Sequence, residues 1–207
     1  HVVAQSADTF VFDRYDDNGN LTAESVMRYQ GSNTTVLKDT VYAADHSFSV
    51  KVYDPATGAV THQEKHDSGG KLIYSQDDSA TAHVQTNYVN GIVSQSATYD
   101  ASWQQVDVLK YSVAGTLTEH DYLNANGYHV IDRYDPATGK IVTQGVFDAA
   151  WKQQSWTTYN TDGSKSVILN HADGSKEIDY YAIDGHAYQI DQFAIDGHKI
   201  GSQMMTM

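Results

Sequence analysis

Hydrophobic and polar residues alternate along most of this chain in runs of about six, and each run ends in a cluster of small, turn-forming residues. Segment 128–134 shows the pattern. Tyr128, Val130 and Tyr134 fall on one face of an extended segment, and His129 and Ile131 fall on the other. Helical spacing of hydrophobic residues is absent almost everywhere. We therefore predict an all-β protein whose short strands are joined by tight turns.

A repeat of about 12 residues sets the length of the predicted strands. An aromatic residue precedes most of the turns, and His66 and His171 take its place in two units. Asp or Asn followed by Gly marks many of the turns, as in Asn126-Gly127 and Asp184-Gly185. Over the middle of the chain the aromatic residues are 11 to 13 positions apart: Tyr88, Tyr99, Tyr111, Tyr122, Tyr134, Phe147 and Tyr159. One strand of about six or seven residues plus one turn accounts for each unit.

Strands joined by turns this short can only be antiparallel neighbours. Dividing the length by the period predicts an antiparallel β-meander of about 14–17 short strands. We expect a single β-repeat domain over residues 1–207, with the repeat region at about 9–200. A sheet of this many strands rarely stays flat, so we expect it to be curled or barrel-like.

Few of the predicted strands have a cleanly apolar face. In segment 60–66, for example, one face carries Val60, His62, Glu64 and His66. A well-filled sandwich would show an apolar face on most strands. We therefore expect a thin core rich in tyrosine, whose rings bury area while their hydroxyls find partners at the edge, and one largely solvated face.

Composition and charge exclude several classes of function. The 207 residues carry a net charge of −13, so the chain repels the phosphates that a nucleic-acid-binding protein must neutralise. No apolar run approaches the roughly 20 residues that span a bilayer, and we expect no membrane insertion. There is no cysteine, which excludes disulfides, cysteine-ligated metal sites and thiol nucleophiles.

One motif carries a resemblance to a known family. The segment Tyr53-Asp54-Pro55-Ala56-Thr57-Gly58 recurs in full at 134–139, and Asp-Gly turns recur along the chain. These units resemble the YD-type (Rhs-like) Tyr-Asp β-hairpin repeats, which are found appended to bacterial secreted polysaccharide-active enzymes and exoproteins. The resemblance implies an extracellular or cell-surface location, association with polysaccharide, and membership of a larger polypeptide.

Tryptophan supplies the leading candidates for a ligand-binding site. Trp103 and Trp151 occupy equivalent turn positions, and Trp156 follows shortly after the second. A flat indole face can stack on a sugar ring, and the amides of Gln105 and Gln153 can bond its hydroxyls. We therefore predict a non-catalytic carbohydrate-binding module for a polysaccharide or oligosaccharide. The alternative is that both turn tryptophans cap the sheet by packing on the next hairpin.

A small glycoside hydrolase or polysaccharide lyase is the first alternative function. Glu177 and Asp179 share one strand face, at a spacing near that of paired catalytic carboxylates. Tyr122 and His120 could instead act as the base and acid of a lyase.

A calcium-responsive structural repeat or adhesin spacer is the second alternative. Asp16, Asn18 and Asn20 resemble the start of an oxygen-ligand loop for Ca²⁺. Position 12 of that loop is Met27 rather than a glutamate, so the loop is not an EF-hand. A solvated β-turn explains the same residues. No other cofactor is expected.

Overall fold

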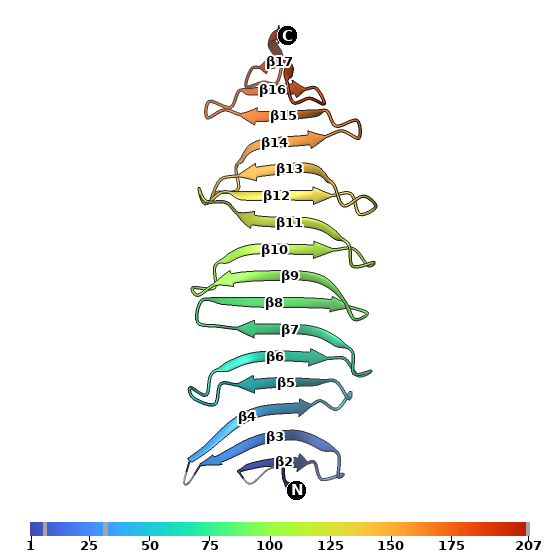
Figure 1. Cartoon of the computed structure of the whole chain (residues 1–207), viewed down its shortest axis with the longest axis vertical. Coiled ribbons are helices and arrows are strands. Elements are labelled where there is room, and N and C mark those ends of the chain that lie inside the picture. The colour runs from blue at the N-terminus through green and yellow to red at the C-terminus, as the bar shows by residue number, and fades with distance from the viewer. Residues whose placement is uncertain (6–7, 31–32, 206–207) are drawn as a thin grey trace. The chain divides into compact units, whose positions relative to one another are not determined.

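The structure, a computed structural model, describes residues 1–5, 8–30 and 33–205. All regular structure within these ranges is β-strand, and they contain no helix. The described residues therefore contain no helix that is long and apolar enough to cross a membrane. The chain divides into two compact units, residues 1–105 and 106–207, and each is an antiparallel meander of strands that follow one another in sequence order (Figure 1).

The strands have the following bounds. The first unit holds β1 (Val2–Ala4), β2 (Thr9–Tyr15), β3 (Leu21–Gln30), β4 (Asn33–Tyr42), β5 (Phe48–Tyr53), β6 (Val60–His66), β7 (Leu72–Asp78), β8 (Ala82–Val89) and β9 (Ile92–Asp100). The second holds β10 (Gln105–Tyr111) apart from its first residue, and β11 (Leu117–Leu123), β12 (His129–Tyr134), β13 (Ile141–Phe147), β14 (Gln153–Tyr159), β15 (Lys165–Asn170), β16 (Lys176–Tyr181), β17 (Ala187–Phe193) and β18 (Lys199–Met204).

The predicted all-β meander is confirmed. The described residues form eighteen strands, one more than the upper end of the prediction, because the three-residue β1 is shorter than the repeat unit from which the number was derived. Within each unit every pairing joins strands that are consecutive in sequence. Each sheet is therefore open. The barrel-like alternative is wrong, because closure would require a first strand to pair with a last one.

One four-residue turn recurs in both units. Its fourth residue donates its backbone N–H to the carbonyl oxygen of the first, and that fourth residue has a positive φ. Glycine adopts this left-handed conformation without steric cost, whereas other L-residues resist it. Eleven turns in the described residues share this frame, with fourth residues Gly19, His46, Gly70, Trp103, Gly115, Gly127, Trp151, Gly163, Gly174, Gly185 and Gly197.

Backbone pairing, more than an apolar core, holds the strands together. Among the described residues only four hydrophobic side chains are buried: Val50, Ala97, Val108 and Val130. Seven polar or charged ones are buried: Thr40, Ser75, Gln76, Asp132, Thr157, Asp179 and Asp191. Polar burial therefore outweighs apolar burial, as the expected thin core requires. Such burial is tolerable where the groups find hydrogen-bond partners, as Asp132 does with the Gln144 amide at 2.8 Å.

We expect Gly127→Ala to destabilise the protein. Gly127 has a φ of +75°, and a Cβ added there meets no atom within 4 Å, so the cost is purely conformational. A left-handed L-residue costs about 1–2 kcal/mol, which urea unfolding would detect. Gly127→Asn is the matched control, because Asn tolerates this conformation better than Ala does. Equal stability of wild type and Gly127→Ala would contradict our account of the turn.

Candidate functional site

Trp103 and Trp151 occupy the turn position that glycine takes elsewhere. Their φ angles are 62° and 60°, and they remain 48% and 52% exposed. A bulky residue in this conformation is an outlier, and its strain of about 1–3 kcal/mol persists only where the surroundings hold it. Residues held in such strained backbone conformations cluster at functional sites.

In the first unit the Trp103 ring stacks on an imidazole. The ring centroids of Trp103 and His83 are 3.7 Å apart and the planes meet at 10°. Tyr99 lies at the side of the tryptophan, 5.8 Å between centroids. His83 and Tyr99 are direct partners across β8 and β9, so the sheet register brings both rings beneath the turn. The turn and the adjacent hairpin thus form one aromatic site.

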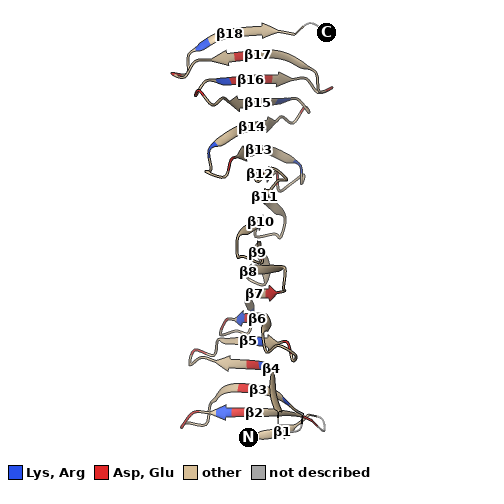
Figure 2. Cartoon of the chain, turned by 90° about the vertical axis from the view of Figure 1, so that its left-hand side faces the viewer, with Lys and Arg blue, Asp and Glu red and all other residues tan. Residues whose placement is uncertain are grey.

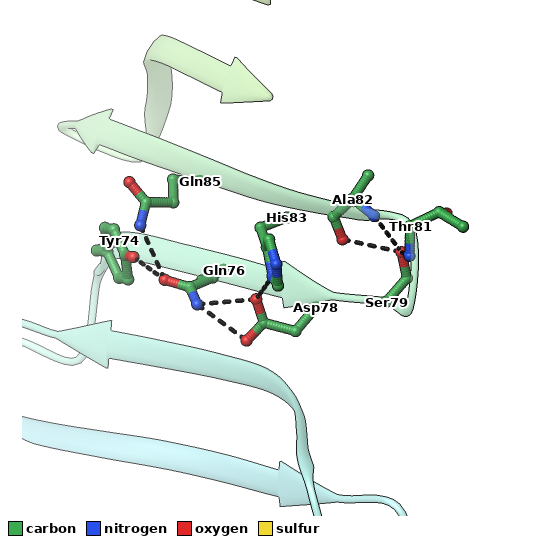
Figure 3. A network of polar contacts seen from close by, with 8 residues as sticks. All are labelled: Tyr74, Gln76, Asp78, Ser79, Thr81, Ala82, His83 and Gln85. Carbon is green, nitrogen blue, oxygen red and sulfur yellow. Dashed lines mark hydrogen bonds and ion pairs between the residues drawn. The ribbon is translucent and has the colours of Figure 1, made fainter. Parts of the chain in front are cut away.

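A polar network fixes the histidine ring of this stack (Figure 3). The Nδ1 atom of His83 lies 2.7 Å from the carboxylate of Asp78. The Gln76 amide donates to both oxygens of that carboxylate at 2.9 Å. The Oε1 atom of Gln76 in turn accepts from the Tyr74 hydroxyl at 2.6 Å and from the Gln85 amide at 3.0 Å. The imidazole is therefore a rigid support for Trp103.

The second unit carries a copy of this site. Trp151 stacks on His129 with a centroid distance of 4.0 Å, and Phe147 lies 6.0 Å away, in the place of Tyr99. His129 and Phe147 are cross-strand partners on β12 and β13. The Nδ1 atom of His129 lies 3.3 Å from the Asp121 carboxylate. We call each arrangement an Asp–His–Trp stack: Asp78, His83 and Trp103 in one unit, and Asp121, His129 and Trp151 in the other.

Trp156 extends the aromatic surface of the second unit. It is the cross-strand partner of Gly145, and a Cβ on that glycine would lie 2.8 Å from the indole and 2.7 Å from Phe147. Both rings therefore lie close over the glycine. The Arg133 guanidinium sits 5.6 Å from the centre of the indole ring. Trp156 is half-buried and packs within the sheet face, whereas Trp151 presents more of its ring to solvent.

The predicted glutamines lie near these tryptophans in the chain. Gln105 is exposed at the start of β10, and Gln153 begins β14, directly after the Trp151 turn. Gln153 is the register partner of Phe147. Among the described residues, no hydrogen bond joins the side chain of either glutamine to an indole. Their predicted role in ligand binding stays a prediction.

Sequence reasoning missed His83 and His129. Each lies on the hairpin that precedes its tryptophan turn, many residues away in the chain, and only strand pairing brings the rings together. One signal was present: His83 follows Asp78 across a short turn, and His129 follows Asp121 across another. Without the register, nothing distinguishes these two histidines from the other eight.

The predicted carboxylate pair lies on β16. Asp179 is buried at 8% exposure, and its Oδ2 accepts from the Tyr181 hydroxyl at 3.3 Å. Burial, and then the charge of Glu177, raise the pKa of Asp179. Its Oδ1 atom is buried and has no hydrogen-bond partner among the described residues. The pair thus has one carboxyl whose pKa is shifted upward, which is the direction that a general acid requires.

The predicted Tyr–His pair lies on β11. The rings of His120 and Tyr122 are 4.6 Å apart, and the Nε2 atom of His120 is 2.7 Å from the Asp107 carboxylate. Burial, followed by the charge of Asp132, raises the pKa of Tyr122. A raised pKa keeps the phenol protonated, which opposes the role of a lyase base.

The predicted calcium ligands lie in the turn between β2 and β3. The Oδ1 atom of Asp16 accepts from the backbone N–H groups of Asn18 and Asn20, and its Oδ2 atom accepts from the Asn20 amide. These bonds hold the turn and compete with a cation for the carboxylate. In the part of the chain that is described, no group of three or more His, Asp or Glu side chains is arranged to hold a metal ion. Calcium binding here stays a prediction.

Acidic residues are distributed over the hairpin turns and the strands of both units (Figure 2). In the turns they accept backbone N–H groups, as Asp100 does from Ser102 at 2.8 Å and from Gln104 at 2.9 Å. Asp148 makes the same two bonds in the Trp151 turn. Acidic side chains thus hold the turns, and Asp100 and Asp148 also place hydrogen-bond acceptors in the two tryptophan turns.

Comparison with known proteins identifies no family. No protein-family model matches the chain, and no curated protein matches it. Among solved structures, a Staphylococcus aureus TarM variant in complex with fondaparinux, α-GlcNAc-glycerol and UDP is 10% identical, with a TM-score of 0.35. The similarity covers 45% of this chain and 19% of that one.

The toxin complex TcdB2-TccC3 is 13% identical over 95% of this chain and 14% of that one, with a TM-score of 0.23. The Photorhabdus luminescens Tc holotoxin pore is 11% identical over 96% and 14%, with a TM-score of 0.18. The chain therefore spans less than a fifth of the length of these proteins. The similarities are weak, and no functional conclusion rests on them.

We expect Asp179→Asn to stabilise the protein at pH 7 but not at pH 3.5. Below its ordinary pKa of 3.8 the carboxyl is protonated in both the folded and the unfolded state. As the pH rises further, the unfolded state ionises first, so folding carries a growing penalty until the raised pKa is passed. Asparagine removes the titration and keeps an acceptor for Tyr181.

Thermal melting of wild type and variant across this pH range is the measurement. A gain in melting temperature that appears above pH 3.8 and then levels off is the expected result. A constant difference at every pH would contradict the assignment of the titration to Asp179. Glu177→Gln is the control. It removes the neighbouring charge and should reduce the pH-dependent penalty without abolishing it, because burial is the larger cause.

Proposed function

We propose that this chain is a non-catalytic glycan-binding module of an extracellular bacterial protein, in which Trp103 and Trp151 each stack on one pyranose ring. The observation that carries the proposal is the strained, half-exposed indole in each Asp–His–Trp stack. One side of each ring rests on a histidine, and about half of the residue surface stays open to a ligand.

The energetics favour a functional role for these tryptophans over edge packing alone. A left-handed residue costs about 1–2 kcal/mol, and glycine avoids that cost in eight of the eleven related turns. An aromatic contact contributes about 0.5–1.5 kcal/mol beyond its area. The strain and this contact term nearly cancel, which leaves only the area buried by the covered side of each ring as a net stabilising term. Retaining a tryptophan in both turns is then better explained by what its open face binds.

The surroundings of the stacks suit a neutral glycan. Sugar hydroxyls both donate and accept, and the turns offer the carboxylates of Asp100 and Asp148 together with amide side chains such as Gln154, which donates to Asp148 at 2.9 Å. The net charge of −13 disfavours an anionic polysaccharide unless a cation bridges it. Each unit carries one stack, so a polymer with many repeats can engage both and gain avidity.

The Tyr-Asp repeats support the proposed context. The all-β meander with its recurring turn has the organisation that such hairpin repeats would have. We therefore propose that the chain is a Tyr-Asp repeat segment attached to a larger secreted or cell-surface protein. On this proposal it holds that protein on polysaccharide and has no catalytic role of its own.

We expect Trp103→Gly and Trp151→Gly each to weaken glycan binding about tenfold while leaving the fold intact. Glycine is the residue that the other turns use, so strain relief offsets the lost stacking. Losing one stacked ring removes roughly 1.4 kcal/mol of binding free energy, which corresponds to a tenfold change in affinity. The measurement is affinity gel electrophoresis with laminarin, xyloglucan, galactomannan and pullulan, and pull-down on cellulose and chitin, with and without chelator.

Two control variants belong to this experiment. Val113→Ala alters an apolar turn residue that is 89% exposed and stacks on no ring, and it should leave retention unchanged. Trp103→Tyr keeps a ring at the site and should retain part of the binding. Unchanged retention in both glycine variants, or no retention of wild type by any polysaccharide, would refute the proposal. A chelator-sensitive melting temperature without retention would favour the calcium-responsive spacer.

A further inference from the structure

A third ring occupies the glycine position of the recurring turn. His46 has a φ of 68° and ends the turn between β4 and β5, as Trp103 and Trp151 end theirs. Tyr42 lies four residues before it, as Tyr99 and Phe147 lie four residues before the two tryptophans. The β4–β5 turn therefore has both the ring at the fourth turn position and the aromatic residue four positions before it. The ring at the turn is an imidazole instead of an indole.

The ring that corresponds to His83 and His129 is missing at this turn. In the two stacks, a histidine is the cross-strand partner of the aromatic residue before the turn. Ala23 pairs with Val41 on β3 and β4, so continuing the register by one residue places Thr22 opposite Tyr42. The Thr22 hydroxyl donates to the carbonyl oxygen of Arg14 at 3.1 Å. A small, internally bonded side chain thus stands where a histidine ring stands elsewhere.

A hollow of about 900 Å³ lies at this place. Its walls come from three turns on the same edge of the first unit: the β2–β3 turn, the β4–β5 turn and the β6–β7 turn. Leu21, Tyr42 and Phe48 supply its apolar lining. Phe48 is held in place by stacking on His66 at 4.3 Å between centroids. The volume is within the usual range of small-ligand sites.

Polar residues from all three turns line the same hollow. Asn18, His46 and Ser68 line it, one from each turn. All three residues are exposed, and within the described part of the chain no protein group hydrogen-bonds to their side chains. Asp16 also lines the hollow, but its carboxylate is engaged with Asn18 and Asn20 and holds the first turn rigid. The hollow thus combines apolar lining with polar residues from three turns.

We infer that this hollow is a third saccharide subsite, which takes one neutral pyranose ring in the space that a histidine fills in the two Asp–His–Trp stacks. The apolar face of the sugar lies against Tyr42 and Phe48, and its hydroxyls bond Asn18, His46 and Ser68. The inference rests on the proposed glycan-binding function but is separable from it, because the hollow contains no tryptophan and can be observed independently.

The test is a two-dimensional ¹H–¹⁵N NMR titration of the full chain. The probes are cellohexaose, maltohexaose, laminarihexaose and mannohexaose at millimolar concentration. The indole N–H signals of Trp103 and Trp151 report on the Asp–His–Trp stacks, and the side-chain amide of Asn18 and the backbone amide of Gly70 report on the hollow. We expect at least one probe to shift both sets of signals.

Thr22→His is the decisive variant, because it restores the ring that the hollow lacks. It should abolish the shifts at Asn18 and Gly70 and leave the indole shifts unchanged. Thr118→His is its matched control, since the Thr118 hydroxyl donates to the Lys110 carbonyl oxygen at 3.0 Å in the same local arrangement, far from the hollow in sequence. That variant should leave every shift as in wild type.

His46→Gly provides a second variant that should fold, because glycine is the usual residue of the turn. It should weaken binding at the hollow about tenfold. Indole shifts without any response at Asn18 and Gly70 would overturn the third subsite and leave the proposed function standing. A response in the hollow alone would uphold the subsite and overturn the role of the tryptophans. No response from either set would overturn both.

Discussion

The left-handed residue that closes each four-residue turn is the constraint on which the rest of this structure depends. It reverses the chain within four residues and returns it in register, so that the backbone groups of each strand are satisfied by the next. With only four hydrophobic side chains buried in the described residues, no apolar core could hold the strands if this ladder were lost. The glycines at this position are therefore structural rather than incidental.

The same register decides which side chains meet. Turns that are two strands apart lie on the same edge of a meander, so a ring at the closing position of one turn reaches the hairpin before it. Trp103 stacks on His83 in this way, and Trp151 stacks on His129. At His46 the corresponding residue is Thr22, and a hollow remains. The three turns that end at His46, Trp103 and Trp151 thus share one backbone conformation and differ in the rings that surround them.

Much of the fold could be predicted from sequence, because its period is local. The aromatic residue, the turn residues and the strand recur within about 12 positions, and turn chemistry alone requires antiparallel neighbours. Trp103 and Trp151 could be recognised as equivalent for the same reason. Openness of the sheets was harder to predict, since it depends on whether distant strands pair. Burial of Asp179, with its raised pKa, likewise depends on neighbouring strands.

By itself the sequence determined the all-β class, the strand period, the turn positions and the acidic surface, all of which follow from residues near one another in the chain. Only the tertiary structure decided the partners of the tryptophans and the hollow beside His46. Those features join residues from different hairpins, and their contacts depend on strand register. A register shift of one residue would turn every ring to the other face of the sheet, and no local pattern specifies that choice.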